Sequence, residues 1–166
     1  MRGARAGRAL DFEALFRRHW PLAYRAAYLV VHDAAAAEDI AQEAFLAALR
    51  NLDRFDRRRP FGPWLHRIVV NRAIDWARAR SLRAESGGEA LAHAVAEAAP
   101  VVGVDEDLLE RIGALSPDHR AVIVLRYLLD YTPGEIAELL ELPRGTVNSR
   151  LRRALDELAE EVPREQ

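Results

Sequence analysis

The chain has 166 residues, of which 50% are hydrophobic and 30% are charged, as is typical of a folded protein. It contains no cysteine, and all 24 basic residues are arginine, which excludes disulfides, cysteine-ligated zinc, the lysine-dependent phosphate loop and Schiff-base chemistry. The net charge of −2 conceals a segregation, because residues 1–83 carry 16 Arg and 9 Asp or Glu, whereas residues 84–142 carry 3 Arg and 12 acids.

A basic first half, an acidic middle and a cluster of arginines over 144–153 indicate two contacts with a polyanion. Ordinary solvated charge is the alternative. No apolar run approaches the roughly 20 residues of a membrane span, and Asp11, not an apolar signal core, follows the basic segment 1–10. We therefore expect a cytoplasmic protein without membrane insertion.

The hydrophobic pattern is helical nearly throughout, and no segment alternates as a strand does. Asp11 is a suitable N-cap for a first helix over 11–31, and His32-Asp33 separates it from a second helix over 34–52. The apolar residues of the second helix recur at spacings of one, three and four, which predicts a single buried stripe. This stripe consists of Ile40, Ala41, Ala44, Phe45, Ala48, Leu49 and Leu52.

A second face of the same helix combines carboxylates with one exposed leucine. Its members are Asp39, Gln42, Glu43, Leu46 and Arg50. Such a face is a plausible docking surface for a protein partner. A solvated face with one stray leucine is the alternative.

The next segment combines arginines with aromatic residues. Residues 53–62 form a predicted loop, and Pro63 suits the first turn of a third helix that runs to about residue 80. Arginines there can follow a phosphate backbone, and aromatic rings can stack on unpaired bases. Phe61 and Trp64 could instead be core residues.

Residues 84–104 are rich in Ala, Gly, Glu and Ser and predict a linker between two domains. Shorter helices follow over about 105–114, 117–129, 133–140 and 144–161. Ser116-Pro117 and Thr132-Pro133 each place an N-cap before a proline at the first helical position.

The last two predicted helices form a candidate helix-turn-helix, with residues 141–143 as the turn. Val147, Leu151 and Leu155 are expected to face the buried seam. Glu141 stands where such turns often have glycine, so the turn must accommodate a side chain or take another geometry. A plain helical hairpin with a solvated basic face is the alternative.

Four segments carry a family resemblance: residues 115–120 (Leu-Ser-Pro-Asp-His-Arg), 122–127, 135–140 and 145–151 (Gly-Thr-Val-Asn-Ser-Arg-Leu). Together they closely resemble the fourth conserved region of bacterial sigma factors of the extracytoplasmic-function (ECF) group of the sigma-70 family. Residues 37–45 are similar to the core-binding helix of that family, and residues 61–75 to its −10 recognition helix. The resemblance covers about 12–80 and 108–160 in the expected order.

The resemblance implies an all-α fold of two small helical domains, the second containing the helix-turn-helix. The expected parts are a basic tail (1–10), a region 2-like domain (11–83), a linker (84–104) and a region 4-like domain (105–162). It implies −35 contacts by Thr146, Asn148, Ser149, Arg150, Arg152 and Arg153. It implies −10 contacts by Arg57, Arg58, Phe61, Trp64, Arg67, Asn71 and Arg72.

The expected function is a transcription initiation factor that binds RNA polymerase core and directs it to promoter DNA. The family implies that the second helix meets the clamp helices of the polymerase through Asp39, Gln42, Glu43, Leu46 and Arg50, that the C-terminal domain touches the flap, and that an anti-sigma factor is a partner. Asn148 and Leu155 replace residues that are usually basic in the family, which leaves the −35 sequence preference open.

Two other classes of function compete with this one. A stand-alone helix-turn-helix regulator would leave the resemblance over 34–80 unexplained. A helical enzyme lacks support, because the five histidines are scattered without metal-ligand spacing and no catalytic constellation is present. We expect no cofactor and no metal.

Overall fold

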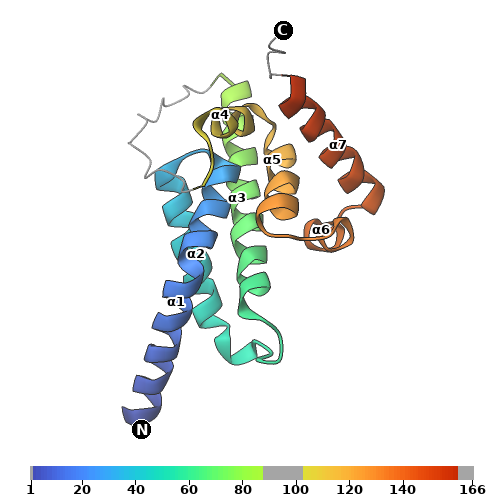
Figure 1. The fold of residues 1–166 in the computed structure, drawn as a ribbon. Helices are drawn as coiled ribbons and strands as arrows, with labels where there is room; N and C mark the ends of the chain where they lie inside the picture. Colours follow the sequence, from blue (N-terminus) through green and yellow to red (C-terminus); the bar gives the residue numbers. More distant parts are fainter. Residues whose placement is uncertain (1, 88–102, 161–166) are drawn as a thin grey trace.

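The computed structural model describes residues 2–87 and 103–160, with side chains from Asp11 onward. This part of the chain contains seven α-helices and no strand, so the all-α prediction is confirmed (Figure 1). The elements are α1 Arg2–Val31, α2 Ala34–Arg50, the 3₁₀ turn η1 Leu52–Arg54, α3 Phe61–Glu85, α4 Glu106–Ala114, α5 Pro117–Ile123, the π-helical turn η2 Val124–Leu128, α6 Pro133–Leu140 and α7 Arg144–Glu160.

The first three helices pack side by side as a bundle, around apolar side chains that include the fully buried Phe45 and Leu65. The stripe predicted on α2 is buried except at its end, where Leu49 is 43% exposed and Leu52 is half-buried in η1. Leu49 falls outside the stripe because α1 and α3 cover a narrower face of α2 than the apolar pattern indicated.

The predicted start of the first helix is wrong, because α1 begins at Arg2 and Asp11 lies inside it. Residues 2–10 are mostly alanine, arginine and leucine, which are good helix formers, and their propensity outweighs the capping preference of Asp11. The predicted break at 32–33 is confirmed. His32 takes a positive φ of 56°, and the Asp33 side chain accepts a hydrogen bond from the Ala36 backbone N–H at 2.9 Å.

The third helix is longer at both ends than predicted. It begins at Phe61 with Pro60 as N-cap, so Pro63 sits in its first turn, and it continues to Glu85. Residues 84 and 85 of the predicted linker are therefore helical, and residues 88–102 of it lie outside the described part.

The predicted caps of the C-terminal helices are confirmed. The Ser116 side chain accepts from the His119 backbone N–H at the start of α5. Thr132 and Glu135 form a reciprocal capping box at the start of α6, with the Thr132 backbone N–H donating to Glu135 at 2.7 Å.

Thr132→Ala is expected to lower the free energy of unfolding by about 1 kcal/mol, because one backbone donor of α6 loses its acceptor. Urea denaturation monitored by circular dichroism measures this. Thr146→Ala, in α7 and without a side-chain cap bond in the structure, is the matched control and is expected to change stability less.

The turn between α6 and α7 accommodates a residue with a side chain where such turns often have glycine. Glu141 adopts the left-handed conformation with a φ of 54°, and the Leu142 backbone N–H donates to the Ala137 carbonyl at 2.9 Å. This is the geometry that glycine commonly provides at a helix C-terminus. The helix-turn-helix thus forms without glycine.

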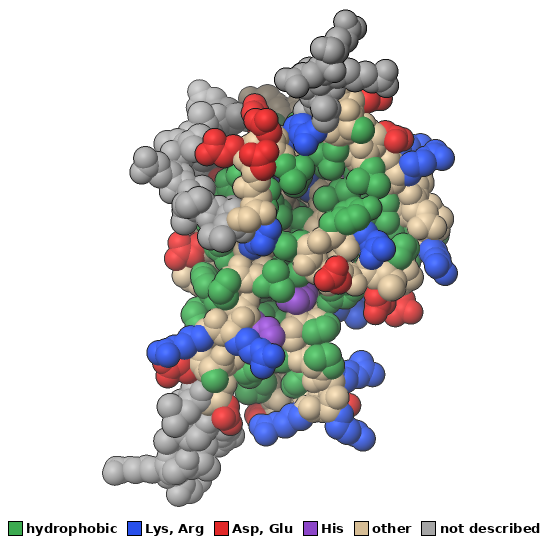
Figure 2. All heavy atoms as spheres, viewed as in Figure 1, with side chains coloured by type: hydrophobic (Ala, Val, Ile, Leu, Met, Phe, Trp, Pro, Cys, Tyr) green, Lys and Arg blue, Asp and Glu red, His purple; other side chains and the backbone are tan. Residues whose placement is uncertain are grey.

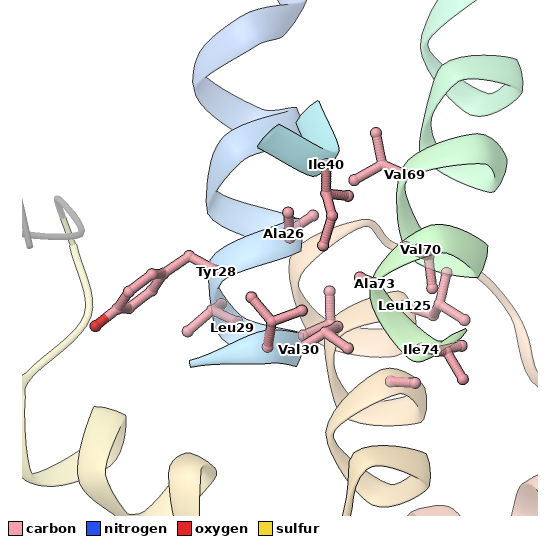
Figure 3. Packing of buried hydrophobic residues seen from close by; sticks show 14 of the residues in the cluster. Ala26, Tyr28, Leu29, Val30, Ile40, Val69, Val70, Ala73, Ile74 and Leu125 are labelled. Atoms are coloured by element: carbon pink, nitrogen blue, oxygen red, sulfur yellow. The ribbon is translucent and has the colours of Figure 1, made fainter. Parts of the chain in front are cut away.

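The two helical units pack against each other. α5 and η2 lie against α1 and α3, and one continuous apolar cluster includes residues of both units. Figure 3 shows Leu125 of η2 beside Val70 and Ile74 of α3. The sequence left the relative placement of the domains open, because the residues that join them are apolar and also serve the core of each unit.

Candidate nucleic-acid and polymerase interfaces

The five side chains predicted on the second face of α2 are all exposed: Asp39, Gln42, Glu43, Leu46 and Arg50. Leu46 is 48% exposed, and Leu49 lies next to it with a similar exposure. The face therefore presents two leucines beside carboxylates, whereas the sequence predicted only one exposed leucine there.

One ion pair joins this face to the neighbouring helix. The Arg72 guanidinium on α3 donates to the Glu43 carboxylate at 2.7 Å, with both side chains partly exposed. Glu43 and Arg72 were predicted to serve different partners, and the structure places them in contact.

The loop before α3 is strongly basic. Arg57, Arg58 and Arg59 are exposed, and Figure 2 shows basic side chains gathered at the end of the molecule where this loop lies in Figure 1. The Asp56 carboxylate accepts from the backbone N–H and the Nε of Arg58, and these bonds lower the pKa of Asp56. Phe55 and Trp64 stack with ring centroids 4.6 Å apart and remain partly exposed.

Phe61 is a core residue in this structure, which is one of the two alternatives that the sequence left open for it. It is 8% exposed and packs against Phe45, Phe55 and Trp64. It is the first residue of the third helix, which begins there instead of at Pro63. Arg67 is exposed and Asn71 is partly exposed.

An open groove of about 820 Å³ separates this basic region from α6. One wall carries Arg54, Arg59, Trp64 and Arg67, and the other carries Glu135 and Glu138 with Tyr131. The Tyr131 hydroxyl donates to the Pro63 carbonyl at 3.2 Å. Burial and the nearby Glu135 raise the pKa of Tyr131, while Arg67 opposes them.

The second helix of the helix-turn-helix has one buried side and one exposed side. Val147, Leu151 and Ala154 are buried, whereas Leu155 is 42% exposed, so Ala154 takes the place in the seam that was predicted for Leu155. Among the predicted −35 residues Asn148, Arg152 and Arg153 are exposed, and Thr146, Ser149 and Arg150 are partly buried. An exposed asparagine and two arginines on one helix suit base edges and phosphates in a major groove.

Arg150 is held by a carboxylate that sequence reasoning missed. Asp118 in the first turn of α5 pairs with Arg150 at 3.2 Å through one oxygen and accepts from Nε and an NH2 group of Arg78 at 2.9 and 2.6 Å through the other. The signal was weak, because the three residues lie far apart in the sequence. Asp118 and Arg150 both belong to the C-terminal unit, and Arg78 of α3 joins them where the two units pack.

The sequence left open whether His66 lies on the surface or in the core, and the structure buries it. It is 7% exposed, and neither ring nitrogen has a hydrogen-bond partner within the described residues. Burial, with a smaller contribution from the neighbouring His19, lowers the pKa of His66 to about 4. Within residues 2–87 and 103–160, no His, Asp and Glu side chains cluster in a way that could hold a metal ion, and no helix is apolar for long enough to cross a membrane.

Two family models match this chain. Sigma-70 region 2 matches residues 15–83, and Sigma-70, region 4 matches residues 105–158. The chain is 35% identical over 153 residues to the ECF RNA polymerase sigma factor SigW of Bacillus subtilis, covering 84% of this chain and 82% of SigW. It is 32% identical over 157 residues to the RNA polymerase sigma-E factor of Streptomyces coelicolor, covering 94% and 88% of the two chains.

Solved structures share the fold. The sigma factor RpoE of Bartonella quintana, crystallised with the anti-sigma factor NepR, aligns with a TM-score of 0.73 at 24% identity over 90% of this chain and 95% of RpoE. CnrH, solved in complex with the cytosolic domain of CnrY, aligns with a TM-score of 0.65 at 29% identity over 95% and 91% of the two chains.

Matches to both regions in one chain rule out the stand-alone regulator, which would leave the region 2 match unexplained. The chain belongs to the extracytoplasmic-function group of sigma-70 family sigma factors, the transcription initiation factors that bind RNA polymerase core and direct it to promoters.

Proposed function

We propose that this chain initiates transcription through two DNA-reading units, residues 11–83 at the −10 element and residues 105–162 at the −35 element, joined by residues 84–104. The observation that carries the proposal is the exposed polar face of α7, which stands in the same chain as the carboxylate and leucine face of α2. The first is suited to duplex DNA and the second to a protein partner.

At the −35 element, α7 enters the major groove with Asn148, Arg152 and Arg153 toward the bases or the backbone. Arginine forks to guanine and asparagine to adenine. Thr146, Ser149 and Arg150 lie beside them and contact the phosphates at the groove edge. The buried residues Val147, Leu151 and Ala154 hold α7 on α5 and α6.

Arg153→Ala is expected to weaken binding to a −35 duplex by about 1–3 kcal/mol if the side chain reads a base. If it contacts a phosphate, the loss is similar for all sequences, and the salt dependence of binding falls by about one counterion. Fluorescence anisotropy at several salt concentrations separates the two cases.

Core binding by the Arg153 variant is expected to be unchanged, and its loss would mean that α7 serves the polymerase instead. Arg17→Ala, which removes an exposed arginine of α1, is the matched control.

At the −10 element, the exposed arginines Arg57, Arg58 and Arg67 follow the backbone of the melted strand. The stacked Phe55 and Trp64 pair offers a partly exposed ring surface to an unpaired base. Asn71 and Arg72 lie further along α3 and line the path of the strand. Binding energy for the exposed strand offsets the cost of unpairing, about a few kcal/mol per base.

The α2 face made of Asp39, Gln42, Glu43, Leu46 and Arg50, extended by Leu49, binds the clamp helices of the polymerase, and the C-terminal unit binds the flap. CnrH was solved in complex with the cytosolic domain of CnrY, and we assign this chain an anti-sigma partner of the same kind. Because its proposed partners, RNA polymerase and promoter DNA, are cytoplasmic, we assign this chain to the cytoplasm. We assign it no chemical step.

In vitro transcription with purified polymerase core on a library of promoters tests the proposal. Transcripts that require this chain and share two sequence elements are expected. If transcription by the core is the same with and without the chain, and the chain does not bind the core, the proposal is refuted.

A further inference from the structure

A small pocket lies where the end of α1, the second half of α3 and α5 meet. Its volume is about 270 Å³. The polar and aromatic side chains that line it are His32, Trp76, Arg80, Ser81 and Arg120, and none of its described lining residues is acidic. We call this the Arg120 pocket. None of these five residues except Arg80, which pairs with Asp33, has an ion-pair partner within the described part of the chain.

Arg120 is the feature of this pocket that most needs an explanation. Its side chain is half-buried on α5, and its Nε is buried without a hydrogen-bond partner within the described residues. Burial, with a smaller contribution from the nearby Arg80 guanidinium, lowers the pKa of Arg120. A partly desolvated cation beside a second cation is unfavourable unless a negative group compensates both.

Arg80 is held in place on the opposite wall. Its guanidinium lies over the Trp76 ring, 5.2 Å from the centroid, and its NH1 group binds the Asp33 carboxylate at 3.2 Å. The Asp33 carboxylate also accepts from the Ala36 backbone N–H, as the cap of α2. Asp33 therefore neutralises at most one of the two guanidinium groups, and the pocket keeps a net positive charge.

His32 adds a third donor with a fixed position. Its ring stacks on Tyr28 with centroids 5.6 Å apart, and its Nδ1 is buried without a hydrogen-bond partner within the described residues. Burial and the nearby Arg120 lower the pKa of His32, so the ring is neutral at neutral pH. A neutral imidazole donates one hydrogen bond, and the Nδ1–H tautomer supplies it here.

The donors define the class of ligand. An arginine fork binds the oxygens of phosphate or sulfate in pairs, and an imidazole N–H and a serine hydroxyl donate to the same kind of oxygen. The volume of about 270 Å³ lies below the roughly 300–1,000 Å³ of pockets that enclose drug-sized ligands. The site therefore suits a free oxyanion better than a nucleotide.

We propose that the Arg120 pocket binds a small free oxyanion of the phosphate class, held between the guanidinium groups of Arg80 and Arg120 with His32 as a further donor. The bound anion supplies the acceptor that the Nε of Arg120 lacks and offsets the repulsion between the two guanidinium groups. The site uses none of the residues assigned to the −10 element, the −35 element or polymerase core, so it is independent of those assignments.

Isothermal titration calorimetry of the full chain with sodium phosphate, at an ionic strength held constant with chloride, tests the site. Saturable binding of one anion per chain is expected. Arg120→Gln is expected to weaken it at least about tenfold, because hydrogen bonds to a charged group are lost. Arg25→Gln is the matched control with unchanged affinity, since Arg25 is also half-buried with an unpartnered Nε but does not line the pocket.

Two further titrations define the ligand. Sulfate is expected to bind with an affinity similar to that of phosphate, and adenosine monophosphate at least about tenfold more weakly, because its nucleoside does not fit the pocket. Equal or tighter binding of adenosine monophosphate would overturn the assignment to a free oxyanion. Absence of phosphate binding, or equal binding by the parent chain and Arg120→Gln, would overturn the site.

A second readout does not depend on the folding of the Arg120 variant. The Cε1 proton of His32, assigned by its loss in His32→Gln, is expected to shift on phosphate addition in the parent chain, and an unchanged resonance would overturn the site. Phosphate is also expected to raise the urea midpoint of the parent chain to a plateau. General exclusion of phosphate from protein surfaces would instead stabilise the parent and Arg120→Gln equally, without a plateau.

Discussion

Reversing the charge of Asp39 and Glu43 to arginine is expected to weaken binding to polymerase core on the order of 100-fold or more. Both carboxylates lie one turn apart on the exposed face of α2, beside Leu46. A charge reversal in a desolvated interface replaces attraction with repulsion and leaves the partner charge unpaired, at a cost of about 2–5 kcal/mol. Titration of labelled core with the variant measures the loss.

The fold is expected to survive this change, because the Glu43 pair with Arg72 is partly exposed and contributes little stability. Glu106→Arg with Glu110→Arg reverses two exposed carboxylates at the same spacing on α4 and is the matched control. Equal core binding by the two double variants would place the polymerase surface elsewhere. Binding to a −35 duplex is expected to remain, since α7 is untouched.

Acidification is expected to destabilise the chain through His66. Its pKa is about 4 in the folded chain and about 6.5 when unfolded, so below pH 6.5 the unfolded state binds a proton that the folded state does not. Stability is therefore present in full above pH 6.5 and falls as the pH drops toward 4. A difference of about 2.5 pKa units corresponds to about 3 kcal/mol.

Urea denaturation at pH 7 and pH 4.5 measures this loss, and His66→Leu isolates it from the other groups that titrate. His19 and His32 also have lowered pKa values, and both remain in the variant. The loss of stability between the two pH values is expected to be about 2–3 kcal/mol smaller in His66→Leu than in the parent chain. An equal loss in both would mean that His66 gains a partner or solvent when it is protonated.

Local signals in the sequence predicted the helix boundaries where a cap was involved. Ser116-Pro117, Thr132-Pro133 and Asp33 each fix a helix start through a side-chain acceptor within three residues. Two starts without such an acceptor, those of α1 and α3, were predicted wrongly, because general helix propensity and tertiary packing decided them, whereas the starts of α4 and α7 were predicted to within one residue.

Tertiary placement explains the remaining errors at the candidate sites. Leu49 and Leu155 fit an apolar period but lie outside the faces that neighbouring helices cover, and both are exposed. Phe61 matched a recognition helix by position yet packs inside the bundle. Asp118 had no local signal, since its two arginines are 40 and 32 positions away in the chain. The pattern predicts which residues lie on a helix face, and only packing determines which faces stay free.

The apolar cluster shared by the two units ties the activity of this protein to its survival in the cell. Val70 and Ile74 are covered by η2 only while the two units are packed. Separating the units without a partner would therefore expose a hydrophobic surface and a less protected backbone to proteases and to other chains. A molecule bound to its target is shielded again. Degradation would then remove idle open molecules first, and the pool of active factor would follow the supply of free polymerase.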